Sequence, residues 1–154
     1  MKKSITTIIL ITFTIIFVNL LIALTTNAQS LGVVGKMYST SDANQIYGKV
    51  TESITINSDL IRNVLDKAGD YIMFYFKNGK LKIFDAKRIE LYPDTGSTID
   101  PNETLRILST SKVRELLLFE KTSTTNIEFR GKVFTITSGM NTLEFVLSCP
   151  PFCW

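Results

Sequence analysis

The chain has 154 residues, of which 17 are Lys or Arg and 14 are Asp or Glu, and it has no histidine. The lack of histidine removes the commonest general base, the commonest metal ligand, and the Ser-His and Cys-His catalytic pairs. The formal charge is only +3, and the basic residues are scattered rather than clustered. These features argue against a nucleic-acid partner, a metal site or a cofactor, and they favour binding over catalysis.

Residues 1–28 have the pattern of a secretory signal peptide. Two lysines precede an apolar run over residues 5–24, and small residues follow it. The Ala28-Gln29 bond is the expected cleavage site, which predicts a secreted or periplasmic protein. The run is also long enough to remain in the bilayer as an uncleaved anchor. A single N-terminal membrane helix is therefore the alternative, and membrane contact is expected through this segment alone.

The composition predicts a single domain after a short lead-in. Residues 29–49 are rich in Gly, Ser, Thr and Asn, and we expect them to be loosely ordered, with room for one edge strand. Residues 50–154 predict an α+β domain: an antiparallel sheet from two tandem β-α-β-β-β units, with two short helices packed on one face. The two units cover residues 50–93 and 104–148, and residues 149–154 form a C-terminal cysteine loop.

The first unit opens with a strand and a helix. Ile54 and Ile56 alternate with polar residues, as in a half-buried strand. Asn57 and Ser58 then provide an N-cap for a helix over residues 58–68, whose apolar residues recur at helical spacing. The sequence therefore predicts a short amphipathic helix directly after the first strand.

A hairpin and a third strand complete this unit. Asn78-Gly79 predicts a two-residue type I′ turn, and residues 89–92 predict the third strand, which ends at Pro93. The register of the turn places four apolar side chains on one face of the sheet, with Phe76 opposite Leu81 and Phe74 opposite Ile83.

The second unit repeats this order. We expect a strand around residues 105–107, a helix over 110–121, and three further strands turned at residues 130–132 and 139–140. Glycine at the first position of the second turn suits a type II′ hairpin. The expected register sets Ile136 opposite Leu143 and Phe134 opposite Phe145.

Individual positions of the two units also match at an offset of 52 residues. This similarity predicts an internal duplication, in which both sets of strands form one continuous sheet with a face free to meet a partner. The matching pairs are Ile61-Arg62 with Val113-Arg114, Val64-Leu65 with Leu116-Leu117, and Gly79-Lys80 with Gly131-Lys132.

Asp94-Thr95-Gly96-Ser97 has the form of the aspartic-protease signature. The resemblance stops at these four residues. In that family a buried apolar strand leads directly into the aspartate, whereas here Pro93 stands immediately before it. The residue types of this stretch are more typical of a turn between the two units than of a protease active site. Asp94 and Asp100 remain the candidate acid pair if the protein is a carboxylate-dependent hydrolase.

Cys149 and Cys153 lie at the C-terminal end of the chain, separated by three residues. In an exported protein, this spacing predicts a small disulfide loop. Thioredoxin-like proteins keep two residues between their cysteines and place the first at a helix N-terminus. The spacing of Cys149 and Cys153 differs from that pattern, so a thiol-disulfide role for this pair is the alternative rather than the main prediction. A zinc site would need two further ligands.

Together these patterns predict an exported, non-catalytic binding or interaction module. Its partner would be a protein, a peptide or an envelope component, engaged through an exposed sheet face or an edge strand. The carboxylate-dependent hydrolase and the thiol-disulfide protein are the two alternative functions.

Overall fold

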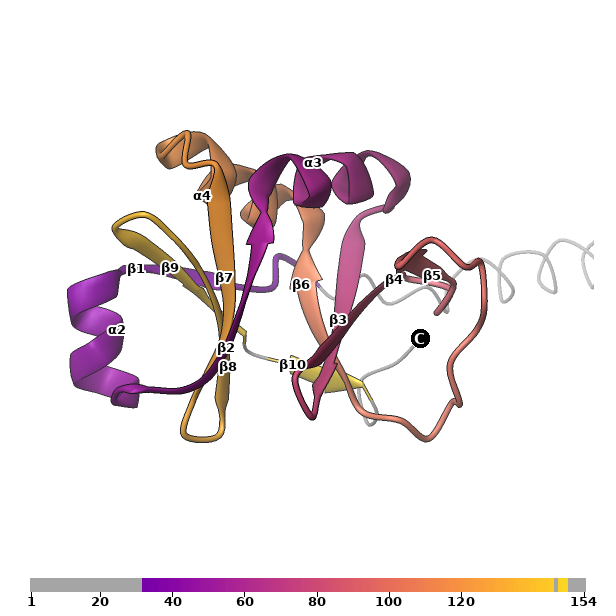
Figure 1. Cartoon of the computed structure of the whole chain (residues 1–154), viewed down its shortest axis with the longest axis horizontal. Helices are drawn as coiled ribbons and strands as arrows, with labels where there is room; N and C mark the ends of the chain where they lie inside the picture. The colour runs from indigo at the N-terminus through magenta and orange to yellow at the C-terminus, as the bar shows by residue number, and fades with distance from the viewer. Residues whose placement is uncertain (1–31, 146, 150–154) are drawn as a thin grey trace, which may run out of the picture. The chain divides into compact units, whose positions relative to one another are not determined.

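The computed structural model describes residues 32–145 and 147–149, and it confirms the α+β class and the two tandem β-α-β-β-β units (Figure 1). The first unit contains β2 (Val50–Asn57), α3 (Ser58–Lys67), β3 (Tyr71–Lys77), β4 (Lys80–Asp85) and β5 (Glu90–Tyr92). The second contains β6 (Leu105–Ser109), α4 (Thr110–Phe119), β7 (Thr124–Arg130), β8 (Val133–Ser138) and β9 (Asn141–Glu144). Strand β1 (Lys36–Ser39) and helix α2 (Thr40–Tyr47) precede the units, and β10 (Leu147–Cys149) follows them.

The strands form two sheets rather than the single continuous sheet that the sequence predicts. Sheet A has the order β1-β9-β8-β7-β2, and sheet B has the order β10-β6-β3-β4-β5. The first strand of each unit therefore lies in the sheet of the other unit: β2 pairs with β7, and β6 pairs with β3. The units are interlocked by this exchange.

The predicted cap and helix of the first unit are confirmed. The side chain of Asn57 accepts a hydrogen bond from the backbone N–H of Asp59 at 2.7 Å, which satisfies one of the free donors of the first helical turn. The α3 residues Ile61, Val64 and Leu65 are buried, as the helical spacing predicts.

The predicted hairpin registers are also confirmed. Phe76 pairs with Leu81 and Phe74 with Ile83, and both turn residues, Asn78 and Gly79, have the positive φ of a type I′ turn. In the second unit, Ile136 pairs with Leu143, and the N–H of Phe145 donates to the carbonyl of Phe134 at 3.1 Å.

One of the proposed matches between the units is displaced by one residue. The first hairpin turns at residues 78–79 and the second at 131–132, so the strands after the helices correspond at an offset of 53 rather than 52. Gly79 thus corresponds to Lys132, not to Gly131. The extra residue lies between the helix and the next strand, since four residues separate α4 from β7 and three separate α3 from β3.

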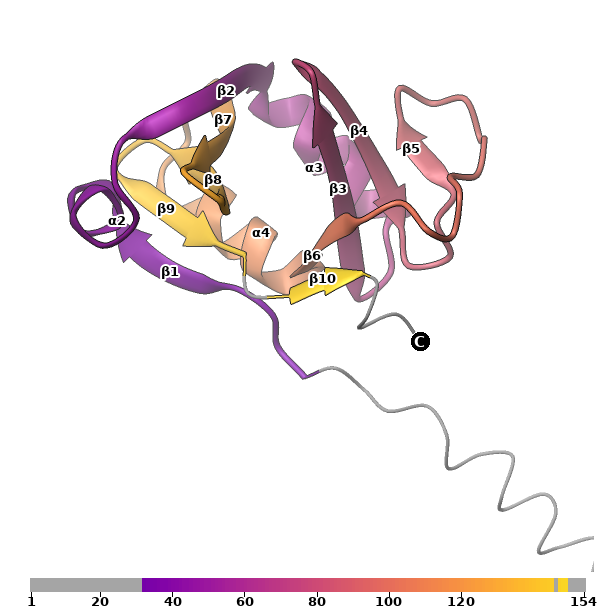
Figure 2. The same cartoon turned by 90° about the horizontal axis from the view of Figure 1, so that it is seen from below.

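The hydrophobic core lies between the two sheets, and α3 and α4 lie side by side across one end of it (Figures 1 and 2). Both sheets and both helices contribute buried apolar side chains, so neither unit encloses a core by itself. The aromatic centre of this core consists of Phe74 from β3, Phe129 from β7, Phe134 from β8 and Phe145 after β9.

The sequence did not predict helix α2, although the lead-in does contain the edge strand, β1, which pairs with β9. Only Ala43 of the eight α2 residues is buried, so the helix shows no apolar stripe. Its N-cap is Ser39, whose hydroxyl accepts a hydrogen bond from the N–H of Asp42 at 3.0 Å. This cap is the one local signal for the helix.

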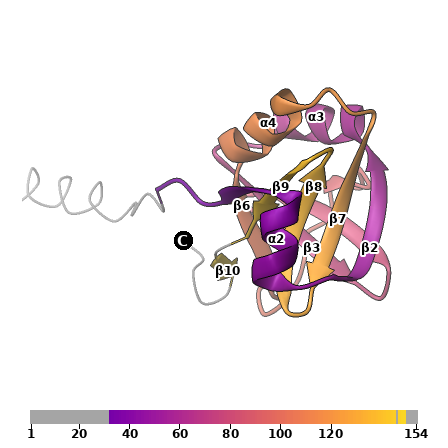
Figure 3. The ribbon, with the colours of Figure 1, turned by 90° about the vertical axis from the view of Figure 1, so that its left-hand side faces the viewer.

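Helix α2 covers a polar face of sheet A (Figure 3). The guanidinium of Arg130 donates to the carboxylate of Glu128 at 2.8 Å and to the side-chain carbonyl of Asn44 in α2. The hydroxyl of Thr137 donates to the same carboxylate at 2.8 Å. Both charged side chains are almost fully buried, and Thr135 and Thr142 are buried on the same face.

Two arginines join α3 and α4 in a reciprocal arrangement. Arg62 of α3 donates to the carbonyl of Leu117 at 3.2 Å, and Arg114 of α4 donates to the carbonyl of Leu65 at 2.8 Å. Both carbonyls lie in the last turn of their helix, where no intrahelical N–H is available to them. The residues of each bond correspond at the offset of 52, so each unit caps the helix of the other.

Replacing Arg114 with alanine is expected to lower the free energy of unfolding by about 1 kcal/mol. A hydrogen bond from a charged donor contributes roughly 1.5–3 kcal/mol, and partial solvent exposure of this side chain reduces that figure. Denaturant unfolding measures the effect, and Arg62→Ala is the matched variant, expected to behave alike. A loss confined to one of the two variants would contradict the reciprocal arrangement.

Candidate interaction surface

Helix α4 exposes two large apolar side chains near its C-terminal end. Its sequence contains the apolar run Leu116 to Phe119, and a helix can direct only part of four consecutive residues toward a core. Leu116 and Leu117 are buried, whereas Leu118 and Phe119 are 73% and 64% exposed. Leu118 and Phe119 were not predicted as site residues, although the length of this apolar run was a signal for an exposed apolar site.

Helix α3 provides an internal comparison for this exposure. At the offset of 52, Leu118 and Phe119 of α4 correspond to Asp66 and Lys67 of α3. Both helices pack in the same way, with buried residues at corresponding positions. The fold therefore does not require apolar residues at the end of α4, and α3 has the charged side chains usual for a solvated face.

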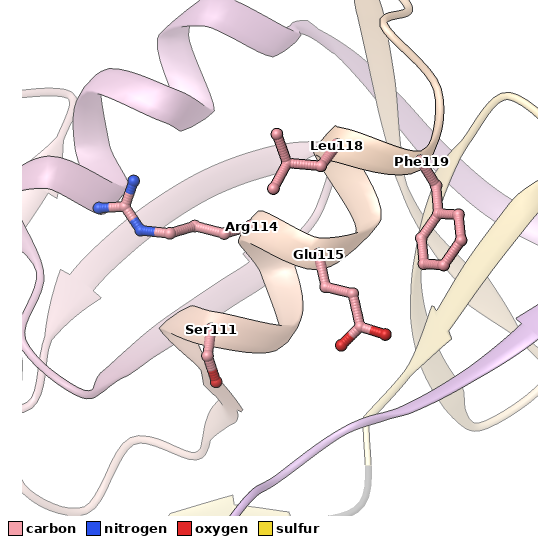
Figure 4. Close-up of a pocket in the computed structure, with 5 residues that line it drawn as sticks. All are labelled: Ser111, Arg114, Glu115, Leu118 and Phe119. Atoms are coloured by element: carbon pink, nitrogen blue, oxygen red, sulfur yellow. The ribbon is translucent and has the colours of Figure 1, made fainter.

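Two shallow hollows lie on either side of Leu118. Figure 4 shows the larger one, of about 480 Å³, and the guanidinium of Arg114 extending from it toward α3. The second hollow, of about 230 Å³, lies between the two helices. Leu118 and Arg114 line both hollows. The other residues of the larger hollow are Ser111, Glu115 and Phe119, and those of the smaller one are Arg62, Leu65, Asp66 and Leu117.

A further exposed apolar residue lies in the turn between β8 and β9, next to the end of α4. Met140 in this turn is exposed, and its N–H donates to the carboxylate of Glu120, the residue after α4, at 2.9 Å. We define the α4 surface as Leu118, Phe119 and Met140. Its charged neighbours on α4 are paired, with Lys112 bonded to Glu115 at 2.6 Å and Arg114 to Asp66 at 2.9 Å.

The candidate acid pair, Asp94 and Asp100, has separate partners in the structure. The Asp94 carboxylate forms an ion pair with Lys67 at 2.5 Å, and the Asp100 carboxylate accepts the N–H of Asn102 at 2.7 Å. Asp94 lines a hollow beside α3, and Asp100 is not among the residues that line this hollow. Both aspartates are exposed, and both belong to the loop that joins the two units.

Glu90 is the buried carboxylate closest in sequence to this loop. Lys82 and Ser97 donate hydrogen bonds to it at 2.6 and 2.9 Å, which attaches the loop to sheet B. Burial alone would raise the pKa of Glu90, but hydrogen bonds from Lys82, Ser97 and Thr95 hold it below its usual value of 4.5.

Replacing Glu90 with glutamine is expected to lower stability at pH 7 but to matter less in acid. A carboxyl group with a lower pKa in the folded chain than in the unfolded chain stabilises the folded state at pH values above its pKa in the unfolded chain. This stabilisation is lost as the pH falls through the pKa of the folded chain. The gap in unfolding free energy between the natural chain and the variant should therefore narrow below about pH 4.5. Unfolding measured from pH 7 into this range is the test, and a gap independent of pH would contradict the assignment.

Several predicted positions fall outside the described residues. The cleavage bond between Ala28 and Gln29 lies before them, and Cys153 lies after them. Cys149 is the last residue of β10, where its backbone pairs with Leu105, and its side chain is outside the description. The disulfide therefore stays a prediction.

Within residues 32–145 and 147–149, none of the helices combines the length and hydropathy needed to cross a membrane. The same residues contain no group of three or more acidic or cysteine side chains placed to hold a metal ion.

Comparison of the chain with protein-family models, with curated proteins and with solved structures found no match.

Proposed function

We propose that this chain is an exported, non-catalytic binding module whose α4 surface contacts a protein, a peptide or an envelope component. The observation that carries the proposal is the difference between the two helices. At corresponding exposed positions, α4 has Leu118 and Phe119, whereas α3 has Asp66 and Lys67. Exposed apolar residues that a fold does not need are typical of interaction sites.

The α4 surface has the arrangement of a small binding hot spot. Large apolar side chains that become fully desolvated supply much of the affinity of interfaces. Fully burying Leu118 or Phe119 would stabilise a complex by about 1.5–3 kcal/mol each. The hollows beside Leu118 offer space for apolar side chains of the partner, and the paired charges around them fit the polar rim of an interface.

A photo-crosslinking experiment with two matched positions tests this proposal. A photoreactive phenylalanine analogue is placed at Phe119 in one variant and at Lys67, the corresponding α3 position, in another. Both variants are exported and irradiated in the native envelope and medium, and crosslinked species are separated by mass. We expect a discrete crosslinked species from position 119 and none from position 67.

The crosslinked species must also depend on the apolar side chains. Adding Leu118→Asp to the variant with the analogue at position 119 should abolish the species, because a charge at this position opposes burial. Equal crosslinking from positions 119 and 67, or none from position 119, would contradict the proposal.

Export has its own test. Mass spectrometry of the natural protein should find a chain that begins at Gln29, as the small residues before it predict. A mass that includes residues 1–28 would instead support the anchored alternative, and a cytosolic location with these residues intact would contradict export.

A further inference from the structure

The outer edge of β6 shows how this fold completes a sheet. Ser109 directs its N–H away from β3 and donates to the carbonyl of Val34 at 2.9 Å. In an antiparallel ladder, alternate residues bond to opposite sides. The backbone groups of Leu105 and Ile107 therefore point outward with those of Ser109, toward β10, which pairs along this edge. Every outward position of β6 thus has a neighbour within the chain.

Among residues 32–145 and 147–149, no strand pairs with the corresponding edge of β2. The N–H of Ser58 donates to the carbonyl of Ser123 at 2.9 Å, so even-numbered residues of β2 bond toward β7. Odd-numbered residues then direct their backbone groups outward. At the offset of 52, the open positions Ser53, Thr55 and Asn57 correspond to Leu105, Ile107 and Ser109 of β6. Among the described residues, β7 is the only strand that pairs with β2.

Strand β2 has few of the features that usually protect an edge, and its β-bulge, between Val50 and Glu52, leaves the residues after it in regular register with β7. It has eight residues, whereas the other edge strands β1, β5 and β10 have four, three and three. It contains no proline and no lysine, and Glu52 is its one charged residue. Long, exposed edges of this composition are templates for pairing with another strand.

We propose that β2 pairs antiparallel with β2 of a second copy of this chain, which joins the two copies of sheet A into one continuous sheet. The two-fold register that sets Ile54 opposite Ile54 brings outward-facing backbone groups together at Ser53 and Thr55. In this register Glu52 faces Ile56, so like charges do not meet. Ile54 is partly buried against the core, and the partner strand completes its burial.

A second copy fits this edge better than an unstructured peptide. Each copy brings a strand already held in extended form by β7, so little ordering is needed on association. A two-fold symmetric pair also gives both open edges a partner at once. Two-fold symmetry is the commonest symmetry of soluble oligomers. The proposal is independent of the α4 surface and does not depend on the function proposed for it.

The test is the oligomeric state of the protein with its natural N-terminus, measured by light scattering and sedimentation velocity at increasing concentration. We expect a monomer–dimer equilibrium for the natural chain and for Ser53→Ala. Ser53→Pro removes an N–H that points away from β7, a position where an edge strand accepts proline. It should raise the dimer dissociation constant by about tenfold or more, because the symmetric interface loses two hydrogen bonds.

Hydrogen exchange of the natural chain gives a second readout that does not depend on a variant. The amides of Ser53, Thr55 and Asn57 should exchange more slowly as the concentration rises. The proposal is overturned by a monomer at all concentrations, by a dimer whose concentration-dependent protection lies away from β2, or by equal dimerisation of folded Ser53→Pro and Ser53→Ala.

Discussion

Replacing Arg130 with methionine is expected to lower the free energy of unfolding by about 3–5 kcal/mol. Arg130 is 2% exposed, and its guanidinium bonds to the buried carboxylate of Glu128 at 2.8 Å. The substitution leaves that carboxylate without its cation in a site that water cannot fully reach. Breaking a buried ion pair by removing one partner is costly for this reason.

Denaturant unfolding of a double-mutant cycle measures this effect. Removing both charges, in Glu128→Leu with Arg130→Met, leaves no buried charge unpaired, so the double variant should be more stable than the sum of the two single changes implies. Additive losses would show that the two side chains do not interact. A loss below about 1 kcal/mol for Arg130→Met would show that the site is open to solvent.

Replacing Phe134 with alanine is expected to cost about 3–5 kcal/mol of unfolding free energy. Its ring is fully buried, and its centroid lies 5.6 Å from the rings of Phe74 and Phe129 and 6.2 Å from that of Phe145. These neighbours come from both sheets and cannot all move to fill the space. The change therefore leaves a cavity at the contact between the two sheets.

The matched control is Phe119→Ala, which removes the same atoms from an exposed position. Its unfolding free energy should stay within about 0.5 kcal/mol of the natural value. Thermal and denaturant unfolding of both variants compare the two positions directly. A large loss for Phe119→Ala would mean that this residue serves the core, which would remove the main support for the α4 surface as a binding site.

The sequence predicted those features of the fold that short-range signals determine. A type I′ turn requires two positive φ angles, which Asn78 and Gly79 adopt readily, and the turn then fixes the register of both strands. Asn57 predicted the start of α3 because its side chain can satisfy a backbone donor within the same turn.

The exchange of first strands could not be predicted in this way. Ile54 and Ile56 alternate with polar residues in either arrangement, because alternation specifies which face of a strand is buried and not which strand lies beside it. The pairing of β2 with β7 joins residues about 70 positions apart, and no turn connects them. The expectation of one continuous sheet failed for this reason.

The candidate site was only partly foreseen. The sequence correctly placed a helix over the region of α4, but the exposure of Leu118 and Phe119 became clear only from its packing. The polar face under α2 was not predicted, because its residues have the pattern of an exposed face although they are buried. Glu128 and Arg130 alternate with apolar residues, a pattern typical of a solvated face, and α2 lacks the apolar stripe that would mark a covering helix.

The interlocked strands imply that each half of this protein is structurally incomplete. A polypeptide consisting of one β-α-β-β-β unit would lack one strand of its sheet. Its own first strand would be unpaired and would fit the sheet of the other unit. Cleaving the chain between Gly96 and Ser97 should therefore give two pieces that remain bound to each other and regain their structure only when mixed.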